Sequence, residues 1–91
     1  MDARASIRLE RLRWRSRRGL LELELLLLPF VENQLLKLSG PMLDQFEALL
    51  ACDDVDIVDW LLGRSNADTE LIDIVLEIQN FNASRSADVG G

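Results

Sequence analysis

The sequence contains no histidine, no tyrosine and only one cysteine, Cys52. A single cysteine cannot form an internal disulfide, and without an imidazole it has neither a base to generate a thiolate nor a partner to share a metal ion. A reducing compartment therefore fits the chain best. Because a hydrolase or transferase needs a nucleophile with a base, a pair of acids held apart or a metal, we predict no catalytic residue and no metal site.

Loops that bind phosphate or calcium are also missing. Gly19, Gly40 and Gly63 are isolated, so none of them belongs to a glycine-rich phosphate cradle. The acidic run Asp53-Asp54-Val55-Asp56 resembles the start of a calcium loop, but it lacks the central glycine and the later bidentate glutamate. We interpret these carboxylates as helix caps.

Long hydrophobic runs are absent. The longest, Leu25 to Val31, is interrupted by Pro29, whereas a membrane-spanning helix needs about 20 apolar residues. The N-terminus has no apolar signal-peptide core, and although its arginines imitate a mitochondrial presequence, serine and threonine are scarce there. We predict no membrane insertion and interpret the arginine-rich start as part of the mature protein.

Leucine dominates the apolar residues and aromatic side chains are few, a composition that favours helices over strands. The chain has 91 residues, 48% hydrophobic and 29% charged, which suits one globular domain. We expect this domain to cover residues 1–82 and residues 83–91 to form a flexible C-terminal tail. The predicted fold class is all-α, a compact five-helix bundle.

The net charge of −6 conceals a division along the chain. Residues 1–18 contain seven arginines and two acids, a sum of +5, whereas residues 19–91 contain three cations and fourteen acids, a sum of −11. Because residues 19–91 are negatively charged, the protein cannot bind polyanions over its whole surface. The cationic start could still contact phosphate, lipid headgroups or an acidic protein surface.

The cationic start predicts an amphipathic first helix from Ala5 to about Arg17. Arginines recur there at steps of four and three, which places one set on a single ridge: Arg4, Arg8, Arg11, Arg15 and Arg18. Apolar residues flank this arginine ridge: Ile7, Leu9, Leu12 and Trp14. The ridge lies either in solvent or on a partner, and repulsion among its charges calls for relief by a partner or by Glu22 and Glu24.

A second helix is predicted from Arg18 to Leu38. Leucine and glutamate alternate with period two from Leu21 to Leu25, which is a strand signal, but both are strong helix formers and no β-branched residue precedes Phe30 in this stretch. The expected inward positions repeat at helical spacing: Leu21, Leu25, Leu28, Val31 and Leu35. Near-continuous leucine predicts burial on most sides, so this should be the central helix, with a bend at Pro29.

Three more helices are predicted from breaks and caps in the sequence. The third starts at Ser39-Gly40-Pro41, the fourth starts after Asp53 or Asp54 and stops at Gly63, and the fifth starts within residues 66–68. The expected inward faces are Met42, Leu43, Phe46, Leu49 and Leu50, then Ile57, Val58, Trp60, Leu61 and Leu62, and finally Leu71, Ile74, Val75, Ile78 and Phe81.

One pattern is not required by packing. It is Arg18-Gly19-x-x-Glu22, preceded by Arg17 and followed by Glu24. If a helix begins at or just before Arg18, then Arg18 and Glu22 stand four residues apart on one face, beside a residue without a side chain. On spacing alone, an ordinary surface ion pair next to a glycine hinge is the commoner explanation, and such a pair contributes on the order of 0.5 kcal/mol.

Three segments in this order resemble one known family. They are Arg17-Arg18-Gly19-Leu20-Leu21-Glu22-Leu23-Glu24, Leu28-Pro29-Phe30-Val31-Glu32, and Cys52-Asp53-Asp54-Val55-Asp56-Ile57-Val58-Asp59-Trp60-Leu61. From about Ile7 to Gln79, the chain is similar to the SdhE-type succinate dehydrogenase assembly factors, also called FAD assembly factors. Each segment is weakly specific alone, but together they are specific for a short all-helical chain.

The resemblance implies a five-helix bundle that binds the flavoprotein subunit of succinate dehydrogenase, and in some bacteria that of fumarate reductase. It implies that the chain promotes covalent attachment of FAD to a histidine of that subunit, without being an enzyme and without stably binding a cofactor. It also favours a monomer in the bacterial cytoplasm over the mitochondrial matrix.

The resemblance places the partner-binding site at Arg18, Gly19 and Glu22, with Arg17 and Glu24 beside them. The chain departs from the family at two positions. Glu24 stands where many members carry aspartate, which keeps the charge on a longer arm, and Val55 stands where many carry proline, in a helix-starting turn. Neither departure changes the implied function.

Other classes of function remain open from the residues. The main alternative is a small helical binding module that uses the arginine ridge on nucleic acid or on an acidic protein surface, although the negative charge of residues 19–91 would repel phosphates. Trp14 and the arginines permit a membrane-surface segment, but Glu10 and a thin apolar face oppose strong insertion. A helical scaffold with another partner differs from the assembly-factor hypothesis only in the identity of that partner.

Overall fold

The computed structural model describes the backbone of residues 3–90 and the side chains of residues 6–85. Within this range the chain forms five α-helices and two 3-10 helices: α1 (Ala3–Arg15), α2 (Leu21–Gln34), η1 (Leu35–Lys37), α3 (Gly40–Leu50), α4 (Asp54–Leu61), η2 (Thr69–Leu71) and α5 (Ile72–Gly90). The described backbone contains no strand. The predicted all-α fold with five helices is therefore confirmed, and the strand signal in the leucine–glutamate alternation is overridden.

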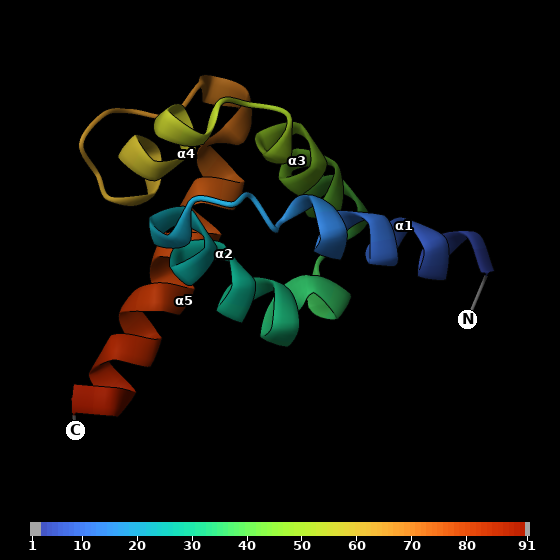
Figure 1. Cartoon of the computed structure of the whole chain (residues 1–91), viewed down its shortest axis with the longest axis horizontal. Coiled ribbons are helices and arrows are strands. Elements are labelled where there is room, and N and C mark those ends of the chain that lie inside the picture. Colours follow the sequence, from blue (N-terminus) through green and yellow to red (C-terminus); the bar gives the residue numbers. More distant parts are fainter. Residues whose placement is uncertain (1–2, 91) are drawn as a thin grey trace.

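The long helix α5 organises the packing (Figure 1). It packs against α2, α3 and α4, and α2 packs in turn against α4. α1 lies beside α3, on the opposite side of the molecule from the C-terminal end of α5. The sequence predicted α2 as the central helix; instead α5 takes that position, because α2 leaves one leucine-rich face outside the bundle.

The core is almost entirely aliphatic, with two phenylalanines at its centre. Phe30 of α2 lies between Phe46 of α3 and Phe81 of α5, with ring centroids 6.0 Å and 5.7 Å away. The remaining buried hydrophobic residues are Leu12, Leu23, Leu27, Val31, Leu35, Leu49, Leu50, Ile57, Val58, Trp60, Leu61, Leu71, Ile74, Val75 and Ile78. Trp60 is thus a core residue, as its helical stripe predicted.

α2 is rotated relative to the prediction. The predicted inward stripe included Leu21 and Leu25, but their side chains are 70% and 63% exposed. Val31 and Leu35 of that stripe are buried as predicted, and Leu28 is half-buried, but the other buried positions of α2 are Leu23, Leu27 and Phe30. Both stripes are apolar at helical spacing, and the one that contains the largest side chain, Phe30, is buried.

The predicted caps hold for α3 and only in part for α4. Ser39 is the N-cap of α3, and its Oγ accepts a hydrogen bond from the Met42 amide at 3.3 Å. Asp53 is the N-cap of α4, but its side chain makes no capping hydrogen bond. Gly63, at a φ of +75°, follows the end of α4 as predicted. Leu62 was predicted to be buried, but it lies in the turn after α4 and is exposed.

The last helix begins later and ends later than the sequence predicted. The segment expected to start it is loop, and η2 precedes α5. The inward positions of this segment are confirmed, with Leu71, Ile74, Val75 and Ile78 buried and Phe81 half-buried. α5 then continues to Gly90, past the change to small and polar residues at which we expected the folded domain to end. In the part of the chain that the structure describes, no helix has the length and apolar character needed to cross a membrane.

Candidate functional site

A short turn after α1 positions the residues of the candidate site. α1 ends at Arg15, and the buried Ser16 donates a hydrogen bond from Oγ to the Leu12 carbonyl at 2.7 Å. Gly19 has a φ of +78°, a left-handed conformation that side chains rarely adopt. A Cβ built on Gly19 would meet no atom within 4 Å. The backbone conformation therefore requires glycine here, while the space beside it is open.

Arg18 is bound within the protein. Its side chain is only 15% exposed, and Nε donates to Asp54 Oδ1 at 2.8 Å. Nη1 donates to the Arg15 carbonyl at 3.0 Å, and Nη2 donates to the Cys52 carbonyl at 3.1 Å. One guanidinium thus joins the end of α1, the loop after α3 and the first residue of α4.

These bonds correct the conditional prediction that Arg18 and Glu22 share a helical face. α2 begins at Leu21, so Arg18 lies in the preceding turn and points to Asp54. Glu22 instead pairs with Arg64, at 4.0 Å between Nη2 and Oε1. Side chains of both residues are more than half exposed, so this pair is a weak surface interaction.

Arg17 faces outward beside an exposed tryptophan. Its guanidinium carbon lies 5.9 Å from the ring centroid of Trp14, which is 72% exposed. This is a cation–π contact at the protein surface. Arg17 and Gly19 are both exposed, and the half-buried Arg18 lies between them.

The two glutamates of the pattern occupy the first turn of α2. Leu20, the N-cap of this helix, provides no side-chain hydrogen bond, so the carboxylates of Glu22 and Glu24 are the anionic groups at the positive end of the helix dipole. Glu22 is exposed and Glu24 is half-buried. Helix stabilisation explains part of their presence, and the exposed carboxylate of Glu22 is accessible to a partner.

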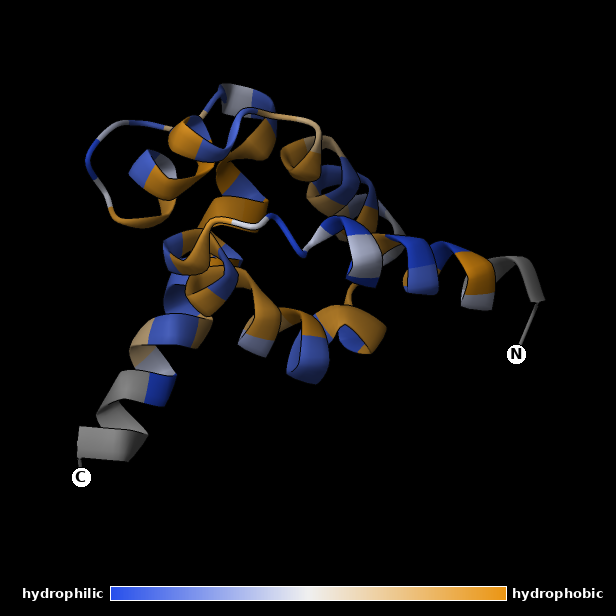
Figure 2. Ribbon diagram, viewed as in Figure 1, coloured by the Kyte–Doolittle hydropathy of each residue, from blue (hydrophilic) through white to orange (hydrophobic). Residues whose placement is uncertain are grey.

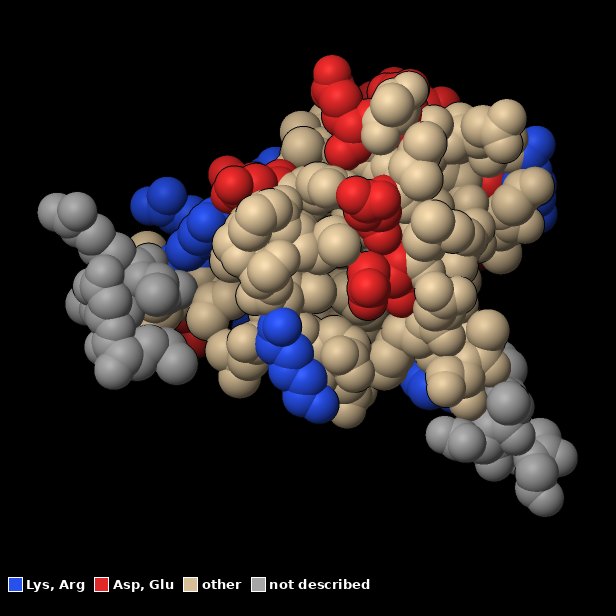
Figure 3. Space-filling model, turned by 180° about the vertical axis from the view of Figure 1, so that it is seen from behind, with Lys and Arg blue, Asp and Glu red and all other residues tan. Residues whose placement is uncertain are grey.

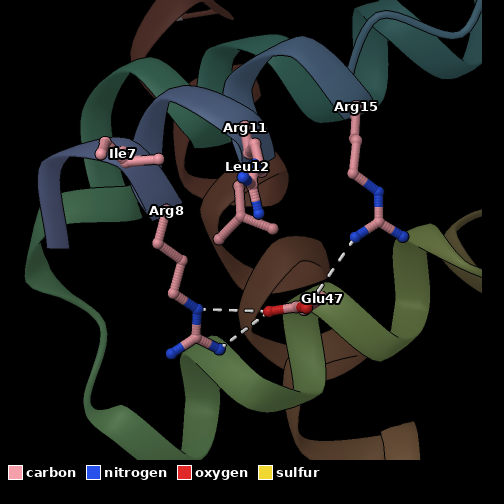
Figure 4. A pocket seen from close by; sticks show the side chains of 6 residues that line it. All are labelled: Ile7, Arg8, Arg11, Leu12, Arg15 and Glu47. Atoms are coloured by element: carbon pink, nitrogen blue, oxygen red, sulfur yellow. Dashed lines mark hydrogen bonds and ion pairs between the residues drawn. The ribbon is translucent and has the colours of Figure 1, made fainter. Parts of the chain in front are cut away.

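Some arginines of the arginine ridge form ion pairs with acids of α3. Arg8 Nη2 lies 2.7 Å from Asp44 Oδ1. Arg8 Nη2 also lies 3.0 Å from Glu47 Oε2, and Arg15 Nη1 lies 4.0 Å from Glu47 Oε1 (Figure 4). The hydrogen bond to Asp44, followed by that to Glu47, raises the pKa of the Arg8 guanidinium. Among the described residues, Asp44 and Glu47, and not Glu22 and Glu24, pair with the arginines of this face. The side chain of Arg4 lies outside the described residues.

The charge division of the sequence is also spatial. Figure 3 shows acidic side chains over the centre and top of one face, and cationic side chains at the edge where α1 lies, with a few more at the lower edge and at the opposite edge. Polar residues cover most of α1, whereas hydrophobic residues run along much of α2 (Figure 2). The turn at Gly19 is therefore the junction between a cationic helix and an apolar helix that begins with acids.

Cys52 is a poor nucleophile in this setting. Burial raises the pKa of its thiol, as do the negative charges of Asp68, Asp56 and Asp53, while Arg18 lowers it. Across the described residues, no group of three or more histidine, cysteine, aspartate or glutamate side chains could hold a metal ion.

Sequence reasoning missed Asp54 as part of the site. Asp54 was expected to act as a helix cap, whereas its carboxylate accepts the hydrogen bond from Arg18. The two residues are 36 positions apart, and no local periodicity links them. The only signal was chemical, because a cationic segment with seven arginines needs carboxylates from elsewhere in the chain.

Comparisons with known proteins give the context for this geometry. A protein-family model described as "Flavinator of succinate dehydrogenase" matches residues 10–82. The FAD assembly factor SdhE of Legionella pneumophila (strain Paris) is 41% identical over 70 residues, which cover 77% of this chain and 89% of the relative. That of Mannheimia succiniciproducens is 42% identical over 73 residues, covering 76% and 85%, and that of Vibrio vulnificus (strain CMCP6) is 41% identical over 58 residues, covering 64% and 67%.

Proposed function

This chain belongs to the family of flavinators of succinate dehydrogenase, and we propose that it binds the flavoprotein subunit of that enzyme and promotes covalent attachment of FAD to it. The single observation that carries the proposal is the family match over residues 10–82, which runs from the middle of α1 into α5. The similarity to curated FAD assembly factors over most of their length supports it.

The docking site that we propose is the turn between α1 and α2. Arg17, Gly19, Glu22 and Glu24 contact the partner, and Arg18 holds the turn in the conformation that presents them. Gly19 supports this role because it is exposed, has open space beside it and allows close approach of another backbone. The exposed carboxylate of Glu22 is available for charge-assisted hydrogen bonds with donors on the partner.

The proposed mechanism is positioning, not chemistry by this chain. The attachment reaction belongs to the flavoprotein, which carries both FAD and the residue that receives it. By binding one conformation of the flavoprotein preferentially, the chain raises the population in which the reacting groups are aligned. It therefore acts as a chaperone, not as an enzyme, and binds no cofactor stably itself. We extend the proposal to the flavoprotein of fumarate reductase, and to a monomer that acts in the bacterial cytoplasm.

The alternative hypothesis, a binding module that uses the arginine ridge on nucleic acid or an acidic protein surface, has less support. Arg8 and Arg15 are paired with acids of α3, and Arg18 is bound to Asp54. Phosphate contacts with these three side chains would compete with intramolecular ion pairs, of which the Arg18–Asp54 pair is the most buried.

The proposal is tested by a flavinylation assay with the purified apo-flavoprotein and FAD, with and without this chain. Covalent FAD is read as fluorescence retained on the flavoprotein after denaturing electrophoresis. We expect attachment to rise with the wild-type chain and to remain near the basal level with Glu22→Ala. Attachment that is indifferent to the chain, together with no detectable complex, would refute the proposal.

A further inference from the structure

The outer face of α2 carries an apolar surface that the bundle does not use. A hollow of about 250 Å³ lies on this face and is lined by Leu21, Glu24, Leu25, Leu28, Pro29 and Glu32. We call this set the α2 groove. Its leucines recur at positions i, i+4 and i+7 and therefore form one stripe along the helix. These three leucines were predicted to face inward together with Val31 and Leu35, of which only the last two are buried.

The core of the bundle does not need the leucines of the α2 groove. The opposite stripe of α2 already supplies the core with fully buried side chains, such as Leu23 and Leu27. Leu21 and Leu25 could be polar without loss of any core contact. Contiguous apolar side chains that the fold does not need are typical of a surface that another protein covers.

Pro29 removes one backbone hydrogen bond beside the groove. Because proline has no amide hydrogen, it cannot donate to the carbonyl of Leu25, four residues earlier in the helix. Leu25 and Pro29 both line the groove. The Leu25 carbonyl therefore lacks its usual helical donor, next to the leucine side chains.

Charge indicates the character of the occupant. Glu24 and Glu32 line the groove itself, and Glu22 lies in the same first turn of the helix. A complementary surface therefore has apolar side chains in its middle and lysine or arginine at its edges. A second copy of this chain meets that requirement poorly at its own α2 groove, because glutamates would face glutamates across a two-fold interface.

We infer that the α2 groove is a second part of the docking surface and that it receives an amphipathic, cation-flanked segment of the flavoprotein subunit. The groove starts at Leu21 and Glu24, next to Glu22 and two residues after Gly19, so one partner can cover both. This inference rests on the proposed function. It extends the contact from a single turn to about three turns of helix and explains why α2 is apolar on both sides.

The test uses exposed leucines as matched pairs. Leu25→Gln and the double variant Leu21→Gln/Leu25→Gln remove apolar groups from the groove while keeping a good helix former of similar size. Leu36→Gln is the control, because Leu36 in η1 is 62% exposed, close to the 63% of Leu25, but does not line the groove. Binding to the purified apo-flavoprotein is measured by calorimetry, and folding is checked by circular dichroism and the thermal midpoint.

We expect the Kd for the flavoprotein to rise at least tenfold for Leu25→Gln and further for the double variant, while Leu36→Gln binds like wild type and Leu25→Met retains binding. Wild-type affinity in the double variant would overturn the inference and leave the proposed function intact. Failure of the wild-type chain itself to bind would instead refute the proposed function. Sedimentation equilibrium tests whether a second copy of the chain occupies the groove instead. A second copy is the occupant if the wild-type chain is a dimer, Leu25→Gln is a monomer, and both bind the flavoprotein equally well.

Discussion

The guanidinium of Arg18 lies 2.8 Å from the carboxylate of Asp54, and this contact joins the turn before α2 to the start of α4. It places one residue of the arginine–glycine pattern inside the fold and leaves its neighbours at the surface. Arg18 therefore acts on the partner through the conformation of the turn. This relationship separates residues that shape the docking surface from residues that contact the partner.

The first prediction concerns this ion pair. Arg18→Ala should lower the free energy of unfolding by about 2 kcal/mol, because three hydrogen bonds from a charged donor are lost and Asp54 is left unpaired. Asp54→Ala should lower flavoprotein binding together with stability, as Arg18→Ala does. Urea titration and calorimetry of both variants provide the measurement. If only Arg18→Ala weakens binding, then Arg18 contacts the partner directly and the positioning role is wrong.

The second prediction uses two glycines in the same backbone conformation. Gly19 and Gly63 have φ values of +78° and +75°, and a Cβ at either would meet no atom within 4 Å. Gly19→Arg and Gly63→Arg should therefore each cost about 1 kcal/mol of stability from backbone strain alone. Only Gly19→Arg should abolish flavoprotein binding, because its side chain occupies the docking site. Equal loss of binding in both variants would indicate that strain, and not position, is responsible.

The third prediction tests the rotation of α2. Leu23 is fully buried, so Leu23→Ala should destabilise the protein by about 3 kcal/mol, from lost burial and an unfilled cavity. Leu21→Ala, two residues away on the exposed face, should change stability by less than about 0.5 kcal/mol. Chemical unfolding of the two variants gives both values. The reverse order would mean that the predicted inward stripe was correct after all.

The fourth prediction concerns Cys52 and pH. Its pKa is raised in the folded protein, first by burial and then by Asp68, so the folded chain keeps the thiol proton at a pH where the unfolded chain has lost it. Cys52 therefore makes its whole contribution to the free energy of unfolding below the thiol pKa of the unfolded chain. This contribution is lost as the pH rises from that pKa through the raised pKa of the folded chain. Native protein should react with iodoacetamide more slowly than urea-unfolded protein at pH 8 to 9. Arg18→Ala should slow the native reaction further, because Arg18 lowers this pKa; a faster reaction would contradict the electrostatic account.

The fifth prediction concerns the C-terminal end. We propose that residues 1–82 form the folded unit and that residues 83–91 are flexible, although α5 is helical to Gly90. Ala83, Ser84 and Arg85 are exposed, whereas Asn82 still donates from Nδ2 to the Leu26 carbonyl at 3.1 Å. Truncation after Asn82 should leave the thermal midpoint within about 2 °C of wild type, because exposed residues contribute little to stability. Truncation after Phe81, which removes that hydrogen bond as well, is the matched variant and should lower the midpoint.

Much of the fold could be predicted because α3, α4 and α5 each carry one apolar stripe. A helix with a single hydrophobic face has only one rotation that buries it, and Ile74, Val75 and Ile78 are accordingly inside. Ser39 fixed the start of α3 in the same local way, through a side chain that bonds the first turn.

One reason explains why neither the rotation of α2 nor the ion pairs of the arginine ridge could be predicted. Leucine surrounds α2, so the sequence offers two equivalent apolar stripes, and the choice between them depends on whether Phe30 fits beside Phe46. Arg8 likewise donates a hydrogen bond to Glu47, a residue that lies 39 positions later in the sequence. Such choices depend on tertiary neighbours, which local periodicity does not contain.

The separation of cationic α1 from the acidic remainder also gives the molecule an electric dipole. Arg11, Arg13 and Arg17 are exposed, while glutamates frame the α2 groove on the other side of the turn at Gly19. A partner with the opposite arrangement of charge experiences a torque before any atoms touch, over a screening distance of about 8 Å in physiological salt. Mutual orientation thus begins during the diffusional encounter, and the turn at Gly19 lies where the two halves of that field meet.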